Sequence, residues 1–288
     1  MNDYQKQTVQ WFPGHMAKTR RQIKESLKLV NAVTELLDAR IPISSRNPEI
    51  DEIVSGKPRI ILLNKCDVAD DNATRKWIEY FKNQGAHALA VDCRTGKGLN
   101  AYRPLIREVL ADKIQSNNEK GMVGKSLRVM VVGIPNTGKS SFINRMAGKN
   151  RAKVADRPGV TRQNQWFAIG NGIELLDTPG VLWPKFEDPA VGDKLAFIGS
   201  VKDEVMDCES LAVRFLDVMK NNYPERLTER YKITDFQDLD PYEVLELIAQ
   251  KRGMKIRGGE ADTERAANTI LDEYRAGKLG KITMEYPY

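Results

Sequence analysis

The segment Gly133–Ser140 reads GIPNTGKS and fits the pattern G-x-x-x-x-G-K-[ST]. The apolar run LRVMVV (127–132) precedes it, and the helical pattern SFINRMAG (141–148) follows it. Such glycines let the backbone wrap around phosphates, whose charge meets amide N–H groups and a helix N-terminus. We expect Lys139 to reach the β- and γ-phosphates and the Ser140 hydroxyl to ligate Mg²⁺. The predicted phosphate-binding residues are Asn136, Thr137, Gly138, Lys139, Ser140 and Ser141.

A second segment, DTPG at 177–180, closes the apolar run IELLD. A carboxylate at the end of such a strand holds Mg²⁺ through water, and the Gly180 amide is placed to sense a γ-phosphate. Thr161, in RPGVTR, lies between the two segments and is a candidate switch residue that closes over the metal. A purely structural threonine is the alternative. The predicted magnesium ligands are Ser140, Thr161 and Asp177.

A third segment, NKCD at 64–67, ends the apolar run RIILL. In N-K-x-D motifs the aspartate accepts two hydrogen bonds from the guanine N1–H and exocyclic amine, which adenine does not offer. The lysine lies over the base and ribose, and the asparagine braces neighbouring loops. The bare tetrapeptide also fits a surface turn. Together with a phosphate loop, Asn64, Lys65 and Asp67 favour guanine over adenine.

The loop DCRTGKG (92–98), at the end of the next apolar run, is similar to the S-A-K-type loop that contacts guanine O6 through a backbone amide. It departs from that pattern at Asp92, Cys93 and Arg94. A backbone contact tolerates such changes, so we assign Cys93 and Arg94 to the nucleotide site without a role for their side chains.

The motifs above follow short apolar runs of strand length, which must position them. Helical patterns at 74–84 and 102–114 lie between some of these runs. Near-continuous apolar strands alternating with helices predict a mostly parallel α/β sheet covered on both faces. Beyond about residue 201 the strand runs stop and helical stretches follow. We therefore predict an α/β domain of the P-loop NTPase class over residues 1–184 and a smaller all-α domain over 201–288. The apolar runs occupy 32–39, 59–64, 87–92, 127–133 and 173–177.

The order of the segments is unusual, because the guanine motif precedes the phosphate loop and DTPG comes last. A sheet accepts such a reordering when the old termini lie close together and a linker joins them. The polar stretch SNNEKGMVGKS (116–126) is the expected linker. This is the motif order of a circularly permuted GTPase.

With WFPGHMAKTRR (11–21) and DARIPISSRNP (38–48) added to these motifs, the chain resembles the RbgA (YlqF) family of bacterial ribosome biogenesis GTPases over nearly its whole length. The resemblance implies GTP hydrolysis to GDP as a switch in late assembly of the large ribosomal subunit, stimulated by the ribosomal particle. It implies a C-terminal domain that contacts ribosomal RNA, and the expected partner is the large-subunit precursor with its rRNA and proteins. The alternative is a GTP-dependent RNA-binding placeholder whose hydrolysis is incidental.

Val181 stands where Ras-type GTPases place the glutamine that orients water, so hydrolysis needs another group. In the family that the chain resembles, the histidine of the FPGHM segment, here His15, is a proposed catalytic residue; a structural or RNA-contacting role is the alternative. Asn136 stands where potassium-dependent GTPases bind K⁺, although an asparagine also suits an ordinary turn. The predicted catalytic set is His15, Lys139 and Thr161.

Composition bounds the remaining possibilities. The net charge of +6 and pI near 9.1 permit binding to a polyanion, and basic residues gather at 1–28 and 251–259. Three cysteines without a C-x-x-C pair argue against a disulfide framework and against zinc. No signal-peptide core or run of about 20 apolar residues is evident. We expect a monomeric cytoplasmic protein that does not bind a membrane.

Overall fold

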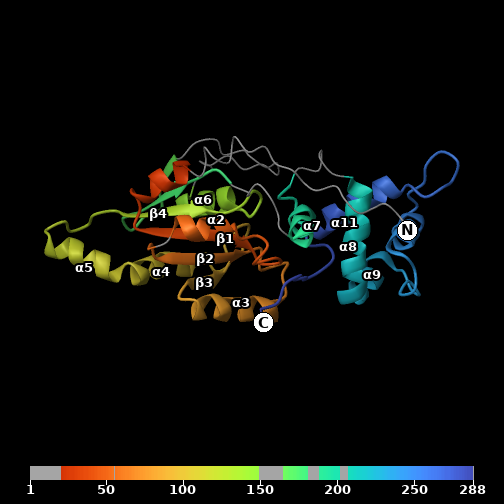
Figure 1. Ribbon diagram of the computed structural model, residues 1–288, viewed down its shortest axis with the longest axis horizontal. Coiled ribbons are helices and arrows are strands. Elements are labelled where there is room, and N and C mark those ends of the chain that lie inside the picture. The colour runs from red at the N-terminus through yellow and green to blue at the C-terminus, as the bar shows by residue number, and fades with distance from the viewer. Residues whose placement is uncertain (1–20, 55, 149–164, 181–187, 202–206, 288) are drawn as a thin grey trace. The chain divides into compact units, whose positions relative to one another are not determined.

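The computed structural model describes residues 21–54, 56–148, 165–180, 188–201 and 207–287 of the chain (Figure 1). The chain divides into two compact units. One, the sheet unit, spans Trp11–Lys185 and Thr283–Tyr288; the other, the helical unit, spans Phe186–Ile282. The sequence predicted that the helical domain continues to residue 288, whereas Thr283–Tyr288 belong to the sheet unit. The described residues do not include His15 and Thr161, which were predicted to be catalytic, or Val181, which stands in place of the glutamine.

The sheet unit contains a six-stranded sheet with the order β3-β2-β1-β4-β6-β5. All neighbouring pairs are parallel except β5 with β6, so the predicted mostly parallel sheet is confirmed. The carboxyl ends of β1, β2, β4 and β6 therefore meet at one edge, where such sheets bind ligands. The strands are β1 (Ala32–Asp38), β2 (Arg59–Asn64), β3 (His87–Ala90), β4 (Leu127–Val132), β5 (Gln165–Ala168) and β6 (Ile173–Asp177).

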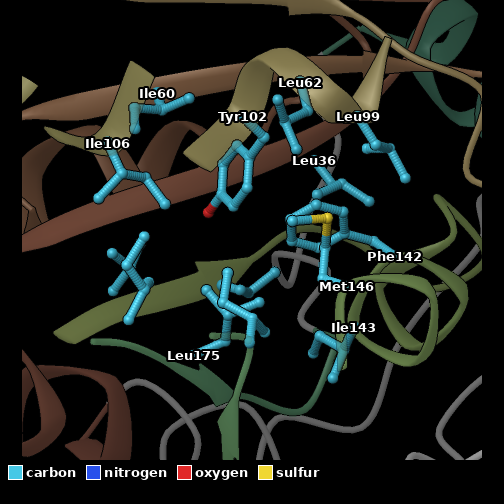
Figure 2. Packing of buried hydrophobic residues seen from close by; sticks show 14 of the residues in the cluster. Leu36, Ile60, Leu62, Leu99, Tyr102, Ile106, Phe142, Ile143, Met146 and Leu175 are labelled. Carbon is cyan, nitrogen blue, oxygen red and sulfur yellow. The ribbon is translucent and has the colours of Figure 1, made fainter. Parts of the chain in front are cut away.

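Successive strand residues point to opposite faces of the sheet. Because the strands are apolar on both faces, helices cover each face. Leu36 packs with Tyr102 and Phe142 on one face, and the next residue, Leu37, packs with Trp77 on the other. Figure 2 shows the first cluster, in which the rings of Tyr102 and Phe142 meet edge to face at 4.9 Å. The helices are α2 (Pro48–Ile53), α3 (Asp71–Asn83), α4 (Tyr102–Val109), α5 (Ala111–Glu119) and α6 (Lys139–Ala147), with a 3₁₀ turn at Leu99–Ala101 and a helical stretch at 21–27.

The helical pattern predicted at 102–114 is divided into α4 and α5 at Leu110, whose backbone leaves the helical region (φ −108°, ψ 20°). Helix α5 then continues to Glu119, so the expected linker at 116–126 begins as a helix. Asn117, within this extension, is buried. The predicted linker is irregular only from residue 120 onward.

The helical unit consists of helices within its described residues, as predicted. Helix α10 begins with a capping box, in which Asp240 and Glu243 bond each other's backbone N–H groups. Phe215 of α8 packs between Phe197 of α7 and Tyr274 of α11. No helix in the described part of the chain is long and apolar enough to span a membrane. The helices are α7 (Pro189–Phe197), α8 (Cys208–Asn222), α9 (Pro224–Tyr231), α10 (Pro241–Lys251) and α11 (Thr263–Arg275).

Candidate nucleotide site

The loop between β4 and α6 folds back tightly at the carboxyl edge of the sheet. Gly133 has φ 151°, and a Cβ there would lie 2.6 Å from the carbonyl oxygen of Leu36. Asn136 adopts φ 61°, a left-handed conformation that is uncommon without glycine. The Thr137 hydroxyl donates to the carbonyl of Ile134 at 3.0 Å and closes the loop. Helix α6 begins at Lys139, so its free N–H groups face the loop interior.

Lys139 is buried beneath this loop. Its Nζ donates to the carbonyl oxygen of Ile134 at 2.9 Å. Burial lowers the pKa of this lysine to about 8, although the carboxylate of Asp177 acts in the opposite direction. The ammonium therefore lies within the phosphate loop and is influenced by the carboxylate at the end of β6.

The segment after β6 lies against the phosphate loop. A Cβ at Gly180 would lie 2.9 Å from Lys139 Nζ and 3.0 Å from the backbone nitrogen of Pro135. The Thr178 hydroxyl donates to the carbonyl of Val131 at 2.7 Å and fixes the segment to β4. The close approach explains why glycine stands at position 180.

The oxygen donors at this edge suit magnesium. Asp177 supplies a buried carboxylate, and Ser140 supplies a hydroxyl at the start of α6. Mg²⁺ prefers oxygen ligands and commonly uses one or two protein groups together with waters and substrate phosphates. Among the described residues no cluster of three His, Cys, Asp or Glu side chains forms a metal site. As oxygen donors at one edge, Ser140 and Asp177 fit a Mg²⁺ ion that a bound nucleotide would help to hold. Thr161 lies outside the described residues.

Asn64 joins three loops at one point. Its Nδ2 donates to the carbonyl of Thr137 in the phosphate loop at 2.7 Å, and its Oδ1 accepts from the N–H of Cys93 at 2.9 Å. Gly138 passes so close that a Cβ there would lie 2.3 Å from Asn64 Nδ2. The NKCD segment, the 92–98 loop and the phosphate loop are thus held together by one buried amide.

Lys65, the next residue, adopts φ 61° and pairs with Asp38 at the end of β1, with 3.0 Å between Nζ and Oδ2. Asp38 also accepts two hydrogen bonds from the guanidinium of Arg40, at 2.9 and 2.8 Å. Burial alone would raise the pKa of Asp38, but the cations of Arg40 and Lys65 outweigh it and hold that pKa well below its usual range. Burial lowers the pKa of Lys65, and Asp38 opposes this shift.

The sequence motifs assign no role to Asp38 or Arg40. Both are almost completely buried, at 0% and 1% of relative exposure. The signal that was available is the pair of opposite charges in D-A-R directly after an apolar strand, where an unpaired charge is costly.

Asp67 and the 92–98 loop face each other through Arg94, whose Nη2 lies 3.3 Å from Asp67 Oδ2. Asp92 accepts from the backbone N–H of Arg94 at 2.8 Å and from the Thr95 hydroxyl at 2.6 Å, so it shapes the loop from within. The N–H groups of Cys93 and Arg94 are thus used inside the protein, and a contact from either to guanine O6 stays a prediction. Cys93 is buried, and burial raises the pKa of its thiol.

The site combines a glycine-rich phosphate loop, a lysine inside it, a carboxylate at the adjacent strand end and an N-K-x-D segment joined to that loop. With the guanine segment first in the chain, this arrangement on a mostly parallel sheet defines a circularly permuted P-loop GTPase. A family model described as "50S ribosome-binding GTPase" matches residues 128–243.

Curated relatives match along the whole chain. A ribosome biogenesis GTPase A from Priestia megaterium is 49% identical over 97% of both chains, and one from Thermotoga maritima is 36% identical over 97% of this chain and 95% of that one. The chain belongs to the ribosome biogenesis GTPase A family, and it is a GTPase, as the motifs predicted.

Two solved structures extend the comparison to three dimensions. GDP-bound YlqF from T. maritima is 32% identical, with a TM-score of 0.66, over 93% of this chain and 99% of that one. The GNP-bound form is 33% identical, with a TM-score of 0.64, over 94% and 98% of the two chains. The likeness to both structures agrees with the predicted fold.

Proposed function

We propose that this protein hydrolyses GTP as a switch in late assembly of the large ribosomal subunit. The observation that best supports a guanine nucleotide switch is the buried amide of Asn64, which joins the guanine segment to the phosphate loop. The role in ribosome assembly is supported by membership of the ribosome biogenesis GTPase A family.

Each candidate residue has a distinct task in the proposed site. Lys139 exchanges its bond to the Ile134 carbonyl for the β- and γ-phosphates, and Asp67 releases Arg94 to accept the guanine N1–H and amine. Ser140, Asp177 and Thr161 would hold Mg²⁺, which would supply positive charge beside the phosphates. The Gly180 amide senses the γ-phosphate. Asn136, Thr137, Gly138 and Ser141 complete the proposed phosphate cradle.

Water activation is assigned to His15, because Val181 has no hydrogen-bonding side chain. The unperturbed pKa of histidine, near 6.5, suits orientation of water or proton exchange close to neutral pH. Replacing His15 by alanine is expected to reduce particle-stimulated turnover by about 100-fold or more while nucleotide affinity is retained. A change within about twofold would exclude this role.

Charge neutralisation beside the γ-phosphate is assigned to K⁺ bound at Asn136. This residue lies in the phosphate loop, and its backbone is left-handed, with φ 61°. A cation there would act as an arginine finger does. Turnover is expected to be faster in KCl than in NaCl at equal ionic strength, and equal rates would remove the assignment.

The ribosomal partner is assigned to the helical unit, whose loop after α10 carries exposed basic residues. This loop forms a small hairpin in which Lys255 bridges Ala261 and the N–H of Ile256 donates to the carbonyl of Glu260. Basic side chains on an exposed hairpin suit the phosphate backbone of rRNA. The basic residues are Lys251, the last residue of α10, and Arg252, Lys255 and Arg257 after it; Arg252 also pairs with Glu273 at 3.5 Å. The protein is proposed to act as a cytoplasmic monomer.

Co-sedimentation with large-subunit precursors on a sucrose gradient tests this function. We expect the protein to travel with the particle when a non-hydrolysable GTP analogue is bound and to remain at the top with GDP. Mature large subunits serve as the control particle. Equal co-sedimentation in both nucleotide states would contradict a switch.

The alternative is an RNA-binding placeholder that requires GTP for binding and hydrolyses it incidentally. It shares the same nucleotide site and the same particle. The two functions differ in one respect: a placeholder does not need the particle to accelerate hydrolysis.

A further inference from the structure

The last residues of the chain form part of the sheet unit. Hydrogen bonds along its backbone and from Thr283 fix this C-terminal tail, Thr283–Glu285. The N–H of Met284 donates to the carbonyl of Arg40 at 2.8 Å, and the Thr283 hydroxyl accepts from the N–H of Asp70 at 2.9 Å. Trp77 Nε1 donates to the carbonyl of Glu285 at 2.9 Å. The tail therefore touches the loop after β1 and the start of α3, which both adjoin the guanine segment.

The Glu285 carboxylate is seated on backbone N–H groups of the loop after β1. It accepts from the N–H of Ile43 at 2.7 Å and from the N–H of Ser44 at 3.1 Å, and the Ser44 hydroxyl donates to it as well. Hydrogen bonds to an ionised acceptor are roughly twice as strong as neutral ones. Glu285 thus holds a loop that lies about 240 residues earlier in the chain.

This loop leads directly to Lys65. The hydroxyl oxygen of Ser45, beside Ser44, accepts from the N–H of Asp38 at 3.0 Å. Asp38 in turn binds both Arg40 and Lys65. The tail thus contacts Arg40, which binds the Asp38 carboxylate, and Ser44, whose neighbour Ser45 holds the backbone of Asp38.

A second route leads to Asp67. The tail holds Asp70 through its backbone N–H, and the Asp70 side chain caps α3 by accepting from the N–H of Ala73 at 2.7 Å. Asp70 follows Asp67 by three residues, across a turn in which the N–H of Val68 bonds the carbonyl of Lys65. The guanine segment thus continues directly into the start of α3, and hydrogen bonds at Val68 and Asp70 hold the connection.

We propose that the C-terminal tail positions Lys65 and Asp67 for guanine, with Glu285 as the main positioning residue. This inference rests on the proposed guanine site. Glu285 bonds the loop after β1 at Ile43 and Ser44, next to the Ser45 hydroxyl that accepts from the backbone N–H of Asp38. Its neighbours Met284 and Thr283 hold Arg40 and the start of α3. Because Thr283 directly follows Ile282 of the helical unit, the same tail also connects that unit to the guanine loops by a covalent path.

The test measures base discrimination in the full chain. Inosine diphosphate lacks the exocyclic amine of guanine and loses one of the two hydrogen bonds to Asp67. We expect the wild type to prefer GDP over IDP by roughly tenfold or more, the value of a hydrogen bond to a charged group. In Glu285→Gln and Glu285→Ala the ratio of the two dissociation constants is expected to fall at least threefold. Glu174→Gln, at a carboxylate paired with Arg128 on β4, is the matched control and keeps the wild-type ratio.

The ratio separates positioning from a general loss of stability. Partial unfolding weakens GDP and IDP binding by the same factor, so an unchanged ratio in the Glu285 variants would overturn the proposal. If Glu285→Ala fails to fold, Thr283→Val, which removes the acceptor for the Asp70 N–H, provides the same readout. A wild type that binds GDP and IDP equally would instead contradict the proposed guanine site itself.

Discussion

Among the described residues of the candidate site, Lys65 and Asn136 adopt a left-handed backbone without being glycine. Such conformations cost of order 1 kcal/mol or more and persist only where surrounding contacts impose them. At Lys65 those contacts include the Asp38 carboxylate. Strain at these positions agrees with a site whose loops are held in place before the nucleotide arrives.

Asp67 is predicted to set the base preference. In Asp67→Asn, the amide NH₂ is a donor and cannot bond the N1–H and amine donors of guanine. It can donate to the carbonyl that xanthine carries at position 2. We expect GDP affinity to fall by about 100-fold or more and XDP affinity to rise above that of the wild type. Fluorescence titration with both nucleotides measures this. Asp112→Asn, on exposed α5, is the control and leaves both affinities unchanged; retained GDP preference in Asp67→Asn would exclude the assignment.

The residues that were predictable from the sequence belong to short, local patterns. The phosphate loop and NKCD each need only a few consecutive residues, and each follows an apolar strand. Glu285 and Arg40 were not predictable in this way, because their partners lie far away in the chain or depend on complete burial. No spacing in the sequence indicates that residue 285 returns to residue 44.

At the scale of elements, the contact between the phosphate loop and the guanine segment depends on Gly138. Its φ is 96°, and an added Cβ would lie 2.3 Å from Asn64 Nδ2. Gly138→Ala is therefore expected to break the bond from Asn64 to Thr137 and to weaken GDP binding by about tenfold or more. Isothermal titration measures this loss.

Gly148, at the end of α6, provides the control for that substitution. It also has a positive φ, 67°, but no atom lies within 4 Å of an added Cβ. Gly148→Ala is expected to cost about 1 kcal/mol of stability without a change in GDP affinity. Equal affinity losses in the two variants would show that backbone strain, and not the contact with Asn64, determines binding.

Asp38 connects β1 to β2 through a buried ion pair, and its removal leaves Arg40 and Lys65 without their shared carboxylate. Asp38→Asn is expected to lower the free energy of unfolding by about 3–5 kcal/mol at pH 7. The folded-state pKa of Asp38 lies well below its unfolded value. Its contribution is therefore complete above about pH 4 and is lost as the pH falls further.

Urea unfolding of the wild type and Asp38→Asn between pH 7 and pH 3 checks both statements. The stability difference is expected to be constant down to about pH 4 and then to shrink by roughly 1 kcal/mol per pH unit. A difference below 1 kcal/mol at pH 7 would contradict the structural importance of the pair.

The fold was predictable at the level of strands, because each apolar run ends at a turn residue and alternates with helical patterns. The parallel order β2-β1-β4-β6 places the end of every motif-bearing strand at one edge. The division at Leu110 and the helical start of the linker were not predictable, because the helical pattern of 102–114 passes through Leu110 without a break and the polar residues at 116–119 carry no apolar repeat.

At the scale of the whole molecule, permutation changes which parts of the GTPase lead into the second unit. The DTPG segment precedes the helical unit in the chain, and the C-terminal tail follows it. The proposed sensor of the γ-phosphate and the proposed support of the guanine loops therefore both adjoin, in sequence, the unit that is proposed to bind rRNA. Such connections suit a switch whose nucleotide state is read by a ribosomal particle.

The central claim is that the particle and the GTPase act together, and single-turnover hydrolysis tests it most directly. Labelled GTP is mixed with excess protein in the presence of Mg²⁺ and K⁺, with and without immature large subunits. Because Val181 does not orient water, we predict slow hydrolysis by the protein alone and an increase of at least tenfold with the particle. Lys139→Ala with the particle controls for contaminating hydrolysis. An identical rate with and without immature subunits would contradict the account and favour the placeholder.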